Sequence, residues 1–231
     1  MLVFAHRGRH HEYLENSFEA IVAALESGCQ ALEVDLQLTR DNKIILLHDF
    51  ELKRLYGVER FVADLTFAEI QCLDNQVGKL GRLICLEELL CQVPANVLLN
   101  LELKTMQWYK TKILVNGVFN ALSKMKRNVI ISSFNPYLLM RYRKLDPQCC
   151  IAPIFGANLY CFKLIVRLTG IKPSSIHFSE KIMNQNLLVQ MHKCGLKVYV
   201  YTVNDQQRYS ELAQMGVDGV FSDNPQLFED N

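Results

Sequence analysis

The sequence lacks the features that divide a chain into separate domains. Only 6 prolines and 11 glycines occur among its 231 residues, and no stretch rich in proline, glycine or serine interrupts it. Half of the residues are hydrophobic, which is enough apolar material for one sizeable core. We therefore expect one domain that spans residues 1–231.

An excess of charge of one sign is lacking as well. Lysine and arginine number 25 and aspartate and glutamate 24, so the net charge is +1. Such a balance gives no overall field that would attract nucleic acid, and an anionic ligand must then be held by a few placed cations. We expect a small-molecule substrate and no nucleic-acid partner.

Long hydrophobic runs are absent. The apolar stretch at 159–168 contains Lys163 and Arg167 and falls short of the ~20 residues needed to span a bilayer. The first residues lead directly into a strand pattern, without the basic segment and cleavage site of a secretory signal. We expect a soluble, cytoplasmic protein, in which 159–168 packs against the core or touches lipid transiently from the rim of the fold.

Cysteine is present but unpatterned. The 8 cysteines are scattered and include the neighbours Cys149 and Cys150, so they lack the spacing of a zinc site or a compact disulfide framework. We expect reduced thiols.

Short apolar runs, often β-branched, alternate with longer stretches of helical period. This pattern is typical of parallel strands joined by crossover helices. Eight strands are expected, which indicates an α/β fold of the closed (β/α)8 class, a TIM barrel. Their ranges are 2–6, 31–38, 97–103, 129–133, 149–155, 175–178, 197–203 and 216–222.

The first helix has recognisable signals at both ends. Asn16 is expected to cap the free backbone N–H groups, with Glu19 at the third helical position. Gly28 is expected to end the helix.

A short segment, 44–47, follows the second strand too closely for a parallel crossover, which needs a dozen or more residues. It must return antiparallel. A turn centred on Asp41 and Asn42 would place Asp35 opposite His48 on one face, and Glu33 would share that face. Residues from about 50 to 95 then form a short insertion on the rim of the barrel, after this hairpin.

Three acidic residues end neighbouring strands of the expected barrel. Glu33, Asp35 and Glu102 would converge at its carboxyl-terminal mouth, because alternate residues of a strand face the same way. Three carboxylates are typical ligands of a hard divalent cation, Mg2+ or Ca2+, and the sequence does not decide between the two ions. Ordinary loop acids or ion pairs are the alternative, but acids inside apolar strands are costly to bury.

Cations and imidazoles accompany the acidic residues. Lys104 and Arg7 would face the same mouth and suit a phosphate group. His6 and His48 are the candidates for acid and base chemistry, because the ordinary pKa of histidine lies near neutral pH. His10 and His11 lie in the first strand-to-helix loop, where we expect solvated side chains rather than metal ligands.

Taken in order, eight short motifs resemble those of the glycerophosphodiester phosphodiesterase family over nearly the whole chain. They are His6-Arg7-Gly8, Glu15-Asn16-Ser17, Glu33-Val34-Asp35, His48-Asp49, Glu102-Leu103-Lys104, Ser133-Phe134, Tyr201-Thr202-Val203-Asn204 and Gly216-Val217-Asp218-Gly219. The resemblance implies a TIM barrel with an insertion after the His-Asp pair.

The same resemblance implies site roles. His6 and His48 would be general base and general acid, the acidic trio would hold the cation, and Arg7 and Lys104 would bind phosphate. Tyr201 replaces the family's usual tryptophan, so it keeps an aromatic wall for the substrate and adds a hydroxyl.

The implied activity is hydrolysis of glycerophosphodiesters to glycerol 3-phosphate and an alcohol, as part of lipid and glycerol metabolism. Two alternatives stay open. One is a lysophospholipase D-like hydrolysis of lysophospholipids with the same catalytic set, which the apolar stretch 159–168 motivates. The other is a noncatalytic phosphate-binding barrel. The sequence does not give the oligomeric state.

Overall fold

A closed ring of parallel strands forms the centre of the protein in a computed structural model, which describes residues 1–74, 81–125, 127–156 and 170–228. The ring closes because β1 pairs with both β2 and β9, and each remaining strand pairs with its neighbours in the order β9, β8, β7, β6, β5, β4, β2. The strands are β1 (Leu2–His6), β2 (Ala31–Leu38), β4 (Leu98–Leu103), β5 (Val129–Ser133), β6 (Cys150–Phe155), β7 (Ser175–Ser179), β8 (Lys197–Tyr201) and β9 (Gly219–Ser222).

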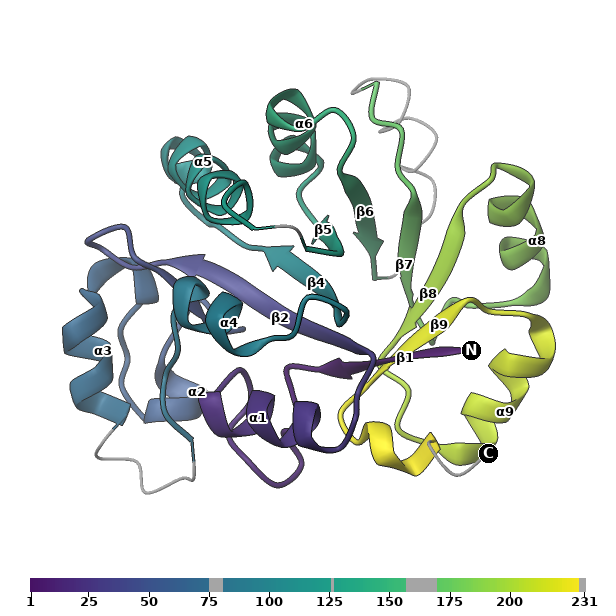
Figure 1. The fold of residues 1–231 in the computed structure, drawn as a ribbon, viewed down its shortest axis with the longest axis horizontal. Coiled ribbons are helices and arrows are strands. Elements are labelled where there is room, and N and C mark those ends of the chain that lie inside the picture. Colours follow the sequence, from purple (N-terminus) through teal and green to yellow (C-terminus); the bar gives the residue numbers. More distant parts are fainter. Residues whose placement is uncertain (75–80, 126, 157–169, 229–231) are drawn as a thin grey trace.

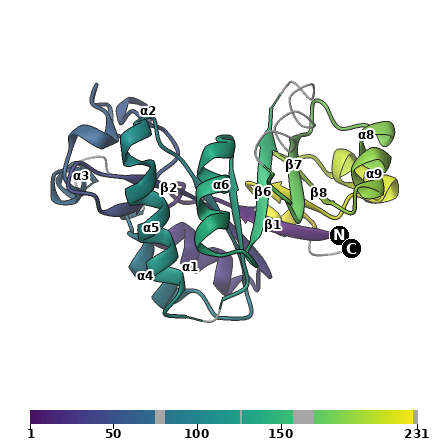
Figure 2. The ribbon, with the colours of Figure 1, turned by 90° about the horizontal axis from the view of Figure 1, so that it is seen from above.

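The predicted TIM barrel is confirmed, and each of the eight predicted strands is present. The helices lie outside the ring (Figures 1 and 2). Those that follow or precede barrel strands are α1 (Phe18–Glu26), α4 (Leu86–Gln92), α5 (Thr111–Leu122), α6 (Pro136–Leu145), α8 (Gln185–Lys193) and α9 (Gln206–Met215). Within the described ranges, 3-10 turns occur at Val62–Asp64, Trp108–Lys110 and Pro225–Phe228.

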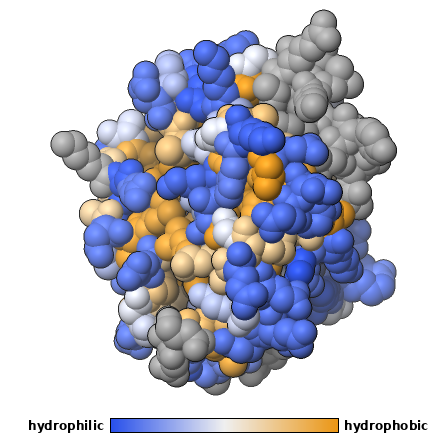
Figure 3. Space-filling view, turned by 90° about the vertical axis from the view of Figure 1, so that its right-hand side faces the viewer, coloured by the Kyte–Doolittle hydropathy of each residue, from blue (hydrophilic) through white to orange (hydrophobic). Residues whose placement is uncertain are grey.

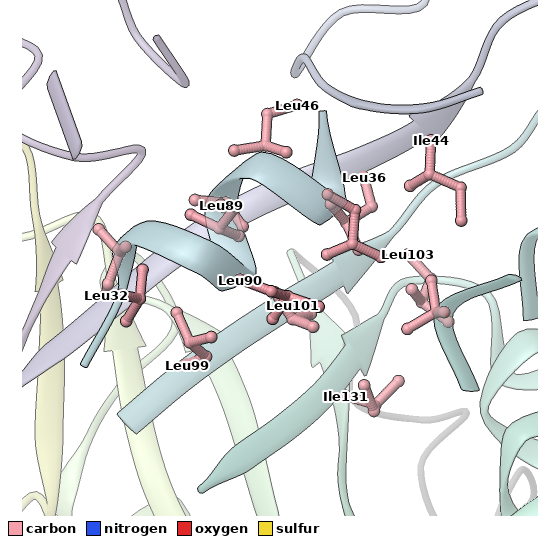
Figure 4. Close-up of a cluster of buried hydrophobic side chains, with 14 of the residues drawn as sticks. Leu32, Leu36, Ile44, Leu46, Leu89, Leu90, Leu99, Leu101, Leu103 and Ile131 are labelled. Atoms are coloured by element: carbon pink, nitrogen blue, oxygen red, sulfur yellow. The ribbon is translucent and has the colours of Figure 1, made fainter. Parts of the chain in front are cut away.

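The alternation of side chains along β4 divides apolar packing from polar chemistry. Leu99, Leu101 and Leu103 face outward and are buried against leucines of α4 and β2 (Figure 4). Successive side chains of a strand point to opposite faces, so the residues between these leucines, Asn100 and Glu102, face into the barrel. The leucine row therefore fixes where the inward polar groups lie.

An apolar layer fills the barrel interior on the amino-terminal side of the acidic residues. It consists of the buried side chains of Phe4, Ala31, Ile130, Ala152, Tyr199 and Phe221. Phe4 stacks on Phe221 with ring centroids 4.5 Å apart. The interior is thus a packed core rather than a pore, and the acidic residues Glu33, Asp35 and Glu102 lie beyond this layer, toward the carboxyl-terminal ends of the strands.

The predicted cap of the first helix is wrong. Ser17, not Asn16, is the N-cap, and its hydroxyl accepts from the backbone N–H of Ala20 at 3.1 Å. Asn16 has a positive φ of 57°, which turns its side chain away from the helix and toward Asp35. Gly28, with φ of 85°, lies just after the helix end, at the position expected for a glycine.

The predicted antiparallel return after β2 is confirmed as β3 (Ile44–Leu46), but its predicted register is wrong by one. Leu36 pairs with Leu46, and the backbone N–H of Leu47 donates to the carbonyl of Asp35 at 3.0 Å. Asp35 therefore lies opposite Leu47 and not opposite His48. The cause is the turn, which Thr39 closes by donating its N–H to the carbonyl of Lys43 at 3.0 Å.

The stretch from 50 to 95 has two parts. The first contains α2 (Lys53–Tyr56) and α3 (Phe67–Asp74). Buried side chains in and around these helices, among them Leu52, Val62 and Ile70, form a small apolar cluster that is separate from the large one. The second part is α4, which packs on β2 and β4 in the large cluster. Within the described residues of this stretch, α2 and α3 are additional to the helices that alternate with barrel strands.

Polar side chains cover much of the face that carries α8 and α9, with hydrophobic ones visible between them (Figure 3). Among the described residues, no helix is both long and apolar enough to cross a membrane. Within the described ranges, Cys72, Cys85, Cys91, Cys149, Cys150 and Cys194 are free thiols.

The outward leucine row predicts a large mutational effect. Leu101 is fully buried, so Leu101→Ala should lower the free energy of unfolding by about 2–5 kcal/mol, through lost burial and a residual cavity. Leu227→Ala, at a side chain that is 47% exposed, is the matched control and should change the free energy of unfolding by less than about 0.5 kcal/mol. Urea denaturation measures both, and equal effects would contradict this packing.

Candidate active site

A cavity of about 180 Å³ opens among the carboxyl ends of the barrel strands. Six of the predicted site residues line it, namely His6, Arg7, Glu33, His48, Glu102 and Tyr201. Asp35 and Lys104 contact this group from the neighbouring positions of β2 and the end of β4. The structure therefore brings all eight predicted side chains into one region.

The three acidic side chains converge as their spacing predicts. Oxygen atoms of Glu33, Asp35 and Glu102 lie within 4.8 Å of one another, and all three residues are buried. Asp35 and Glu102 are adjacent because β2 and β4 pair in register at these positions. Asn16 steadies Asp35, since its Nδ2 donates to Oδ2 at 2.8 Å and its Oδ1 accepts from the Asp35 N–H at 3.1 Å.

Burial and mutual repulsion act unequally on the trio. They raise the pKa of Glu33 well above its usual value and raise the pKa of Glu102 to about 7, with the charge of Asp35 contributing after burial in both cases. Asp35 differs: although burial opposes its ionisation, Lys104 and then Arg7 hold its pKa well below the usual range. Asp35 is thus the permanently charged member.

The two predicted phosphate ligands are paired with acids. Lys104 Nζ lies 2.9 Å from Asp35 Oδ1 and 3.2 Å from Glu102 Oε1. Arg7 Nε lies 3.3 Å from Asp35 Oδ2, and its Nη1 donates to Glu15 at 3.0 Å. Both cations therefore border the trio, where they lower the negative charge that an anionic group would meet.

The donor set fits a hard divalent cation. It offers carboxylate oxygens only, which Mg2+ and Ca2+ prefer. Two of the three carboxyls have raised pKa values, first because they are buried and then because neighbouring acidic charges repel them, and a bound cation would offset both effects. A second cluster within the described residues, His6, His10 and Asp223, has mixed ligands instead.

His6 and His48 each contact an aspartate through Nδ1. His6 Nδ1 lies 2.6 Å from Asp223 Oδ1, and His48 Nδ1 lies 2.6 Å from Asp49 Oδ1. In each ring the carboxylate favours a proton on Nδ1 and leaves Nε2 free toward the cavity. Burial lowers the pKa of both histidines and favours the neutral ring, which can accept a proton on Nε2. The hydrogen bond to the carboxylate acts in the opposite direction and stabilises the protonated ring, which can donate that proton.

Comparison with known proteins decides the family. The model of the glycerophosphoryl diester phosphodiesterase family matches residues 6–227. The chain belongs to this family. Both the predicted family and the predicted class of enzyme, a phosphodiesterase, are confirmed.

Relatives of the family resemble the chain over almost its full length. A glycerophosphodiester phosphodiesterase of Caldanaerobacter subterraneus is 29% identical over 97% of this chain and 95% of its own. A human lysophospholipase D is 23% identical over 98% of this chain and 84% of its own.

Solved structures of the family share the fold. The glycerophosphodiester phosphodiesterase of Thermotoga maritima has a TM-score of 0.83 and 28% identity, and the match covers 99% of this chain and 96% of that one. An Oleispira antarctica phosphodiesterase in complex with the product sn-glycerol-3-phosphate has a TM-score of 0.87 at 22% identity, covering 100% and 96%.

Sequence reasoning missed the supports of the histidines in this member of the family. Asp223 follows the last strand and also accepts from Asn204 Nδ2 at 2.7 Å. His10 was expected to be solvated, which is wrong, because its Nε2 lies 2.7 Å from the same Asp223 Oδ1 and its side chain is only 18% exposed. Its neighbour His11 is 35% exposed and contacts Glu12. A usable signal existed: Asp223 lies directly after a strand, as Arg7 and Lys104 do.

The wall of the cavity is aromatic, as the sequence predicts for Tyr201. Its ring meets that of Phe134 edge to face, with centroids 6.2 Å apart. Tyr201 and Phe134 both line the cavity.

The contact with Asp223 predicts the protonated nitrogen of His6. In the wild type, long-range ¹H–¹⁵N NMR spectra should show the neutral His6 ring with its proton on Nδ1. Asp223→Ala removes the acceptor and should shift the proton toward Nε2. Asp218→Ala removes the partner of a surface histidine, His192, and should leave His6 unchanged. An unchanged His6 spectrum in Asp223→Ala would contradict the assignment.

The raised pKa of Glu102 predicts pH-dependent metal affinity. At pH 6 a cation must displace a proton from this carboxyl, whereas at pH 8 it is already ionised, so Mg2+ or Ca2+ should bind about tenfold more weakly at pH 6. Titration calorimetry at both pH values measures this. Glu102→Gln should weaken binding at both, and Glu211→Gln on α9 is the control. Equal affinity at pH 6 and pH 8 would be the contrary result.

Proposed function

We propose that the protein hydrolyses glycerophosphodiesters to glycerol 3-phosphate and an alcohol, with a divalent cation, with His6 as general base and with His48 as general acid. The observation that carries the proposal is the pair of imidazoles, each with Nδ1 on a carboxylate, in one cavity beside the buried acidic trio. The Oleispira antarctica phosphodiesterase, which shares the fold, is bound to sn-glycerol-3-phosphate, the product proposed here.

The proton transfers follow from this arrangement. His6 accepts the proton of the glycerol 2-hydroxyl as its oxygen bonds to phosphorus, and His48 donates a proton to the alcohol oxygen as its bond to phosphorus breaks. The resulting cyclic phosphate is opened by water. His48 accepts the water proton and His6 returns a proton to the 2-oxygen of glycerol, so both side chains regain their starting states.

The remaining side chains hold the charges. Glu33, Asp35 and Glu102 would bind Mg2+ or Ca2+, which supplies stabilisation of the negative charge that develops on the phosphoryl oxygens. Arg7 and Lys104 add two positive charges at the same place and orient the phosphate group.

A lysophospholipid substrate is the second candidate, because curated relatives of human and mouse origin are lysophospholipase D enzymes. A groove beside His48 contains the apolar side chains of Phe50, Phe61 and Met106, which an acyl chain would contact. Charged side chains also line it, namely Asp49, Glu51, Lys53, Arg54 and Lys104. The segment 159–168, which motivated this alternative in the sequence, lies outside the described residues. A noncatalytic barrel has no support, because each proposed catalytic side chain is retained.

Substitution of the histidines tests the proposed roles. His6→Ala and His48→Ala should each lower the rate of glycerophosphocholine hydrolysis by about 10²- to 10⁴-fold, because each removes a proton-transfer group. Both variants should keep a thermal transition close to that of the wild type. His192→Ala, on the outside of the barrel, is the control and should keep the full rate. Near-normal rates in both cavity variants would refute the assignment.

The preference of the wild type for glycerophosphodiesters over lysophospholipids is tested by comparing their rates of hydrolysis. After chelation, Mg2+ or Ca2+ is restored and the hydrolysis of glycerophosphocholine and lysophosphatidylcholine is compared. Faster release from glycerophosphocholine supports the proposal, and equal or faster hydrolysis of the lysolipid favours the second candidate. No product from either with either ion would favour a noncatalytic barrel.

A further inference from the structure

The floor of the cavity carries polar atoms that the catalytic roles above do not use. Asn100 and His177 line the cavity and are each 1% exposed, and Tyr201 lines its wall. Within the described ranges, Asn100 Oδ1, His177 Nε2 and Tyr201 Oη are buried without a hydrogen-bond partner. Unpaired buried polar atoms cost stability, so three of them around one cavity indicate a ligand that completes their hydrogen bonds.

The place of these atoms in the barrel is defined by strand register. Asn100 on β4 pairs with Glu33 on β2, and Glu33 pairs with His6 on β1. Below them lies the apolar layer, on which His177 packs with its ring centroid 4.9 Å from that of Phe221 and 5.5 Å from that of Tyr199. A ligand group that reaches the floor therefore lies next to His6.

All three side chains are neutral. The Asn100 amide donates from Nδ2 to Ser132 Oγ at 2.9 Å, which leaves its oxygen as an acceptor. Burial lowers the pKa of His177 to about 3, so the ring is uncharged. Burial and then the charge of Glu102 raise the pKa of Tyr201 far above neutral pH, so its phenol keeps its proton.

A neutral set of donors and acceptors matches alcohol groups. A hydroxyl both donates and accepts, as does each of a neutral imidazole and a phenol, and the amide oxygen accepts. A phosphate group would instead be drawn to the cations Arg7 and Lys104 at the acidic trio. The two ends of a polar substrate would thus be sorted by charge within one cavity.

We propose that Asn100, His177 and Tyr201 form a subsite for the free hydroxyl groups of the glycerol moiety, a vicinal diol. This inference rests on the proposed function and names the residues that recognise one half of its substrate. By holding the diol on the floor, the subsite brings the attacking hydroxyl to His6. It also favours an unacylated glycerol, because an acyl ester removes one of the two hydroxyls that the floor would bind.

Binding of two phosphate monoesters tests the subsite without turnover. sn-Glycerol 3-phosphate carries both hydroxyls, whereas propyl phosphate has the same length and neither. Titration calorimetry with Mg2+ present measures the affinity of the wild type and of each variant for both compounds. The preference is the ratio of the affinity for sn-glycerol 3-phosphate to that for propyl phosphate. His177→Phe keeps an aromatic ring without its nitrogens, and Tyr201→Phe removes only one oxygen.

Each variant should reduce the preference for glycerol phosphate by about 3- to 10-fold, the effect of one lost hydrogen bond, with propyl phosphate affinity unchanged. Tyr137→Phe, at an exposed phenol on α6, should keep the wild-type preference. Because Tyr201→Phe removes a single buried oxygen, it decides the test even where His177→Phe disturbs folding.

An unchanged preference in both variants would overturn the subsite, as would a wild type that hydrolyses glycerophosphodiesters but binds the two monoesters alike. A wild type that neither binds glycerol phosphate nor hydrolyses its diesters would overturn the proposed function as well. The two failures are therefore distinguishable.

Discussion

The buried cluster of three carboxylates and two cations is the constraint on which the rest of the site depends. The leucines on the outer faces of β2 and β4 pack under α4. The alternate residues Glu33, Asp35 and Glu102 must therefore point into the barrel interior. Lys104 and Arg7 offset part of the charge, but two carboxyl groups still have raised pKa values. The two cations thus do not fully balance the three carboxylates, and a bound divalent cation would stabilise the ionised cluster.

The histidines show how separate elements reach one chemical result. His6 ends the first strand and is supported by Asp223 from beyond the last, while His48 follows the hairpin and is supported by its neighbour Asp49. Arg54 from α2 donates to both Asp49 and Glu15, and Glu15 in turn accepts from Arg7. The rim structure at α2 is therefore connected to the cavity through charged hydrogen bonds.

Much of this could be predicted from local pattern, and what failed depended on tertiary geometry. The spacing of Glu33 and Asp35 within an apolar strand predicts a shared face, which the structure bears out. The position opposite Asp35 depends on where Thr39 closes the turn, which the sequence does not specify. Asp223 contacts His6 across 217 residues only because the barrel closes, and neutral residues such as His177 and Asn100 carry no pattern that marks them in a strand.

The location of the bound cation tests the central claim most directly. Crystals of the protein soaked in Mn2+, an X-ray-visible substitute for Mg2+, give an anomalous signal at each bound ion. We expect one strong peak within about 2.0–2.6 Å of carboxylate oxygens of Glu33, Asp35 and Glu102. A peak at His6, His10 and Asp223 instead, with none at the acidic trio, would contradict it.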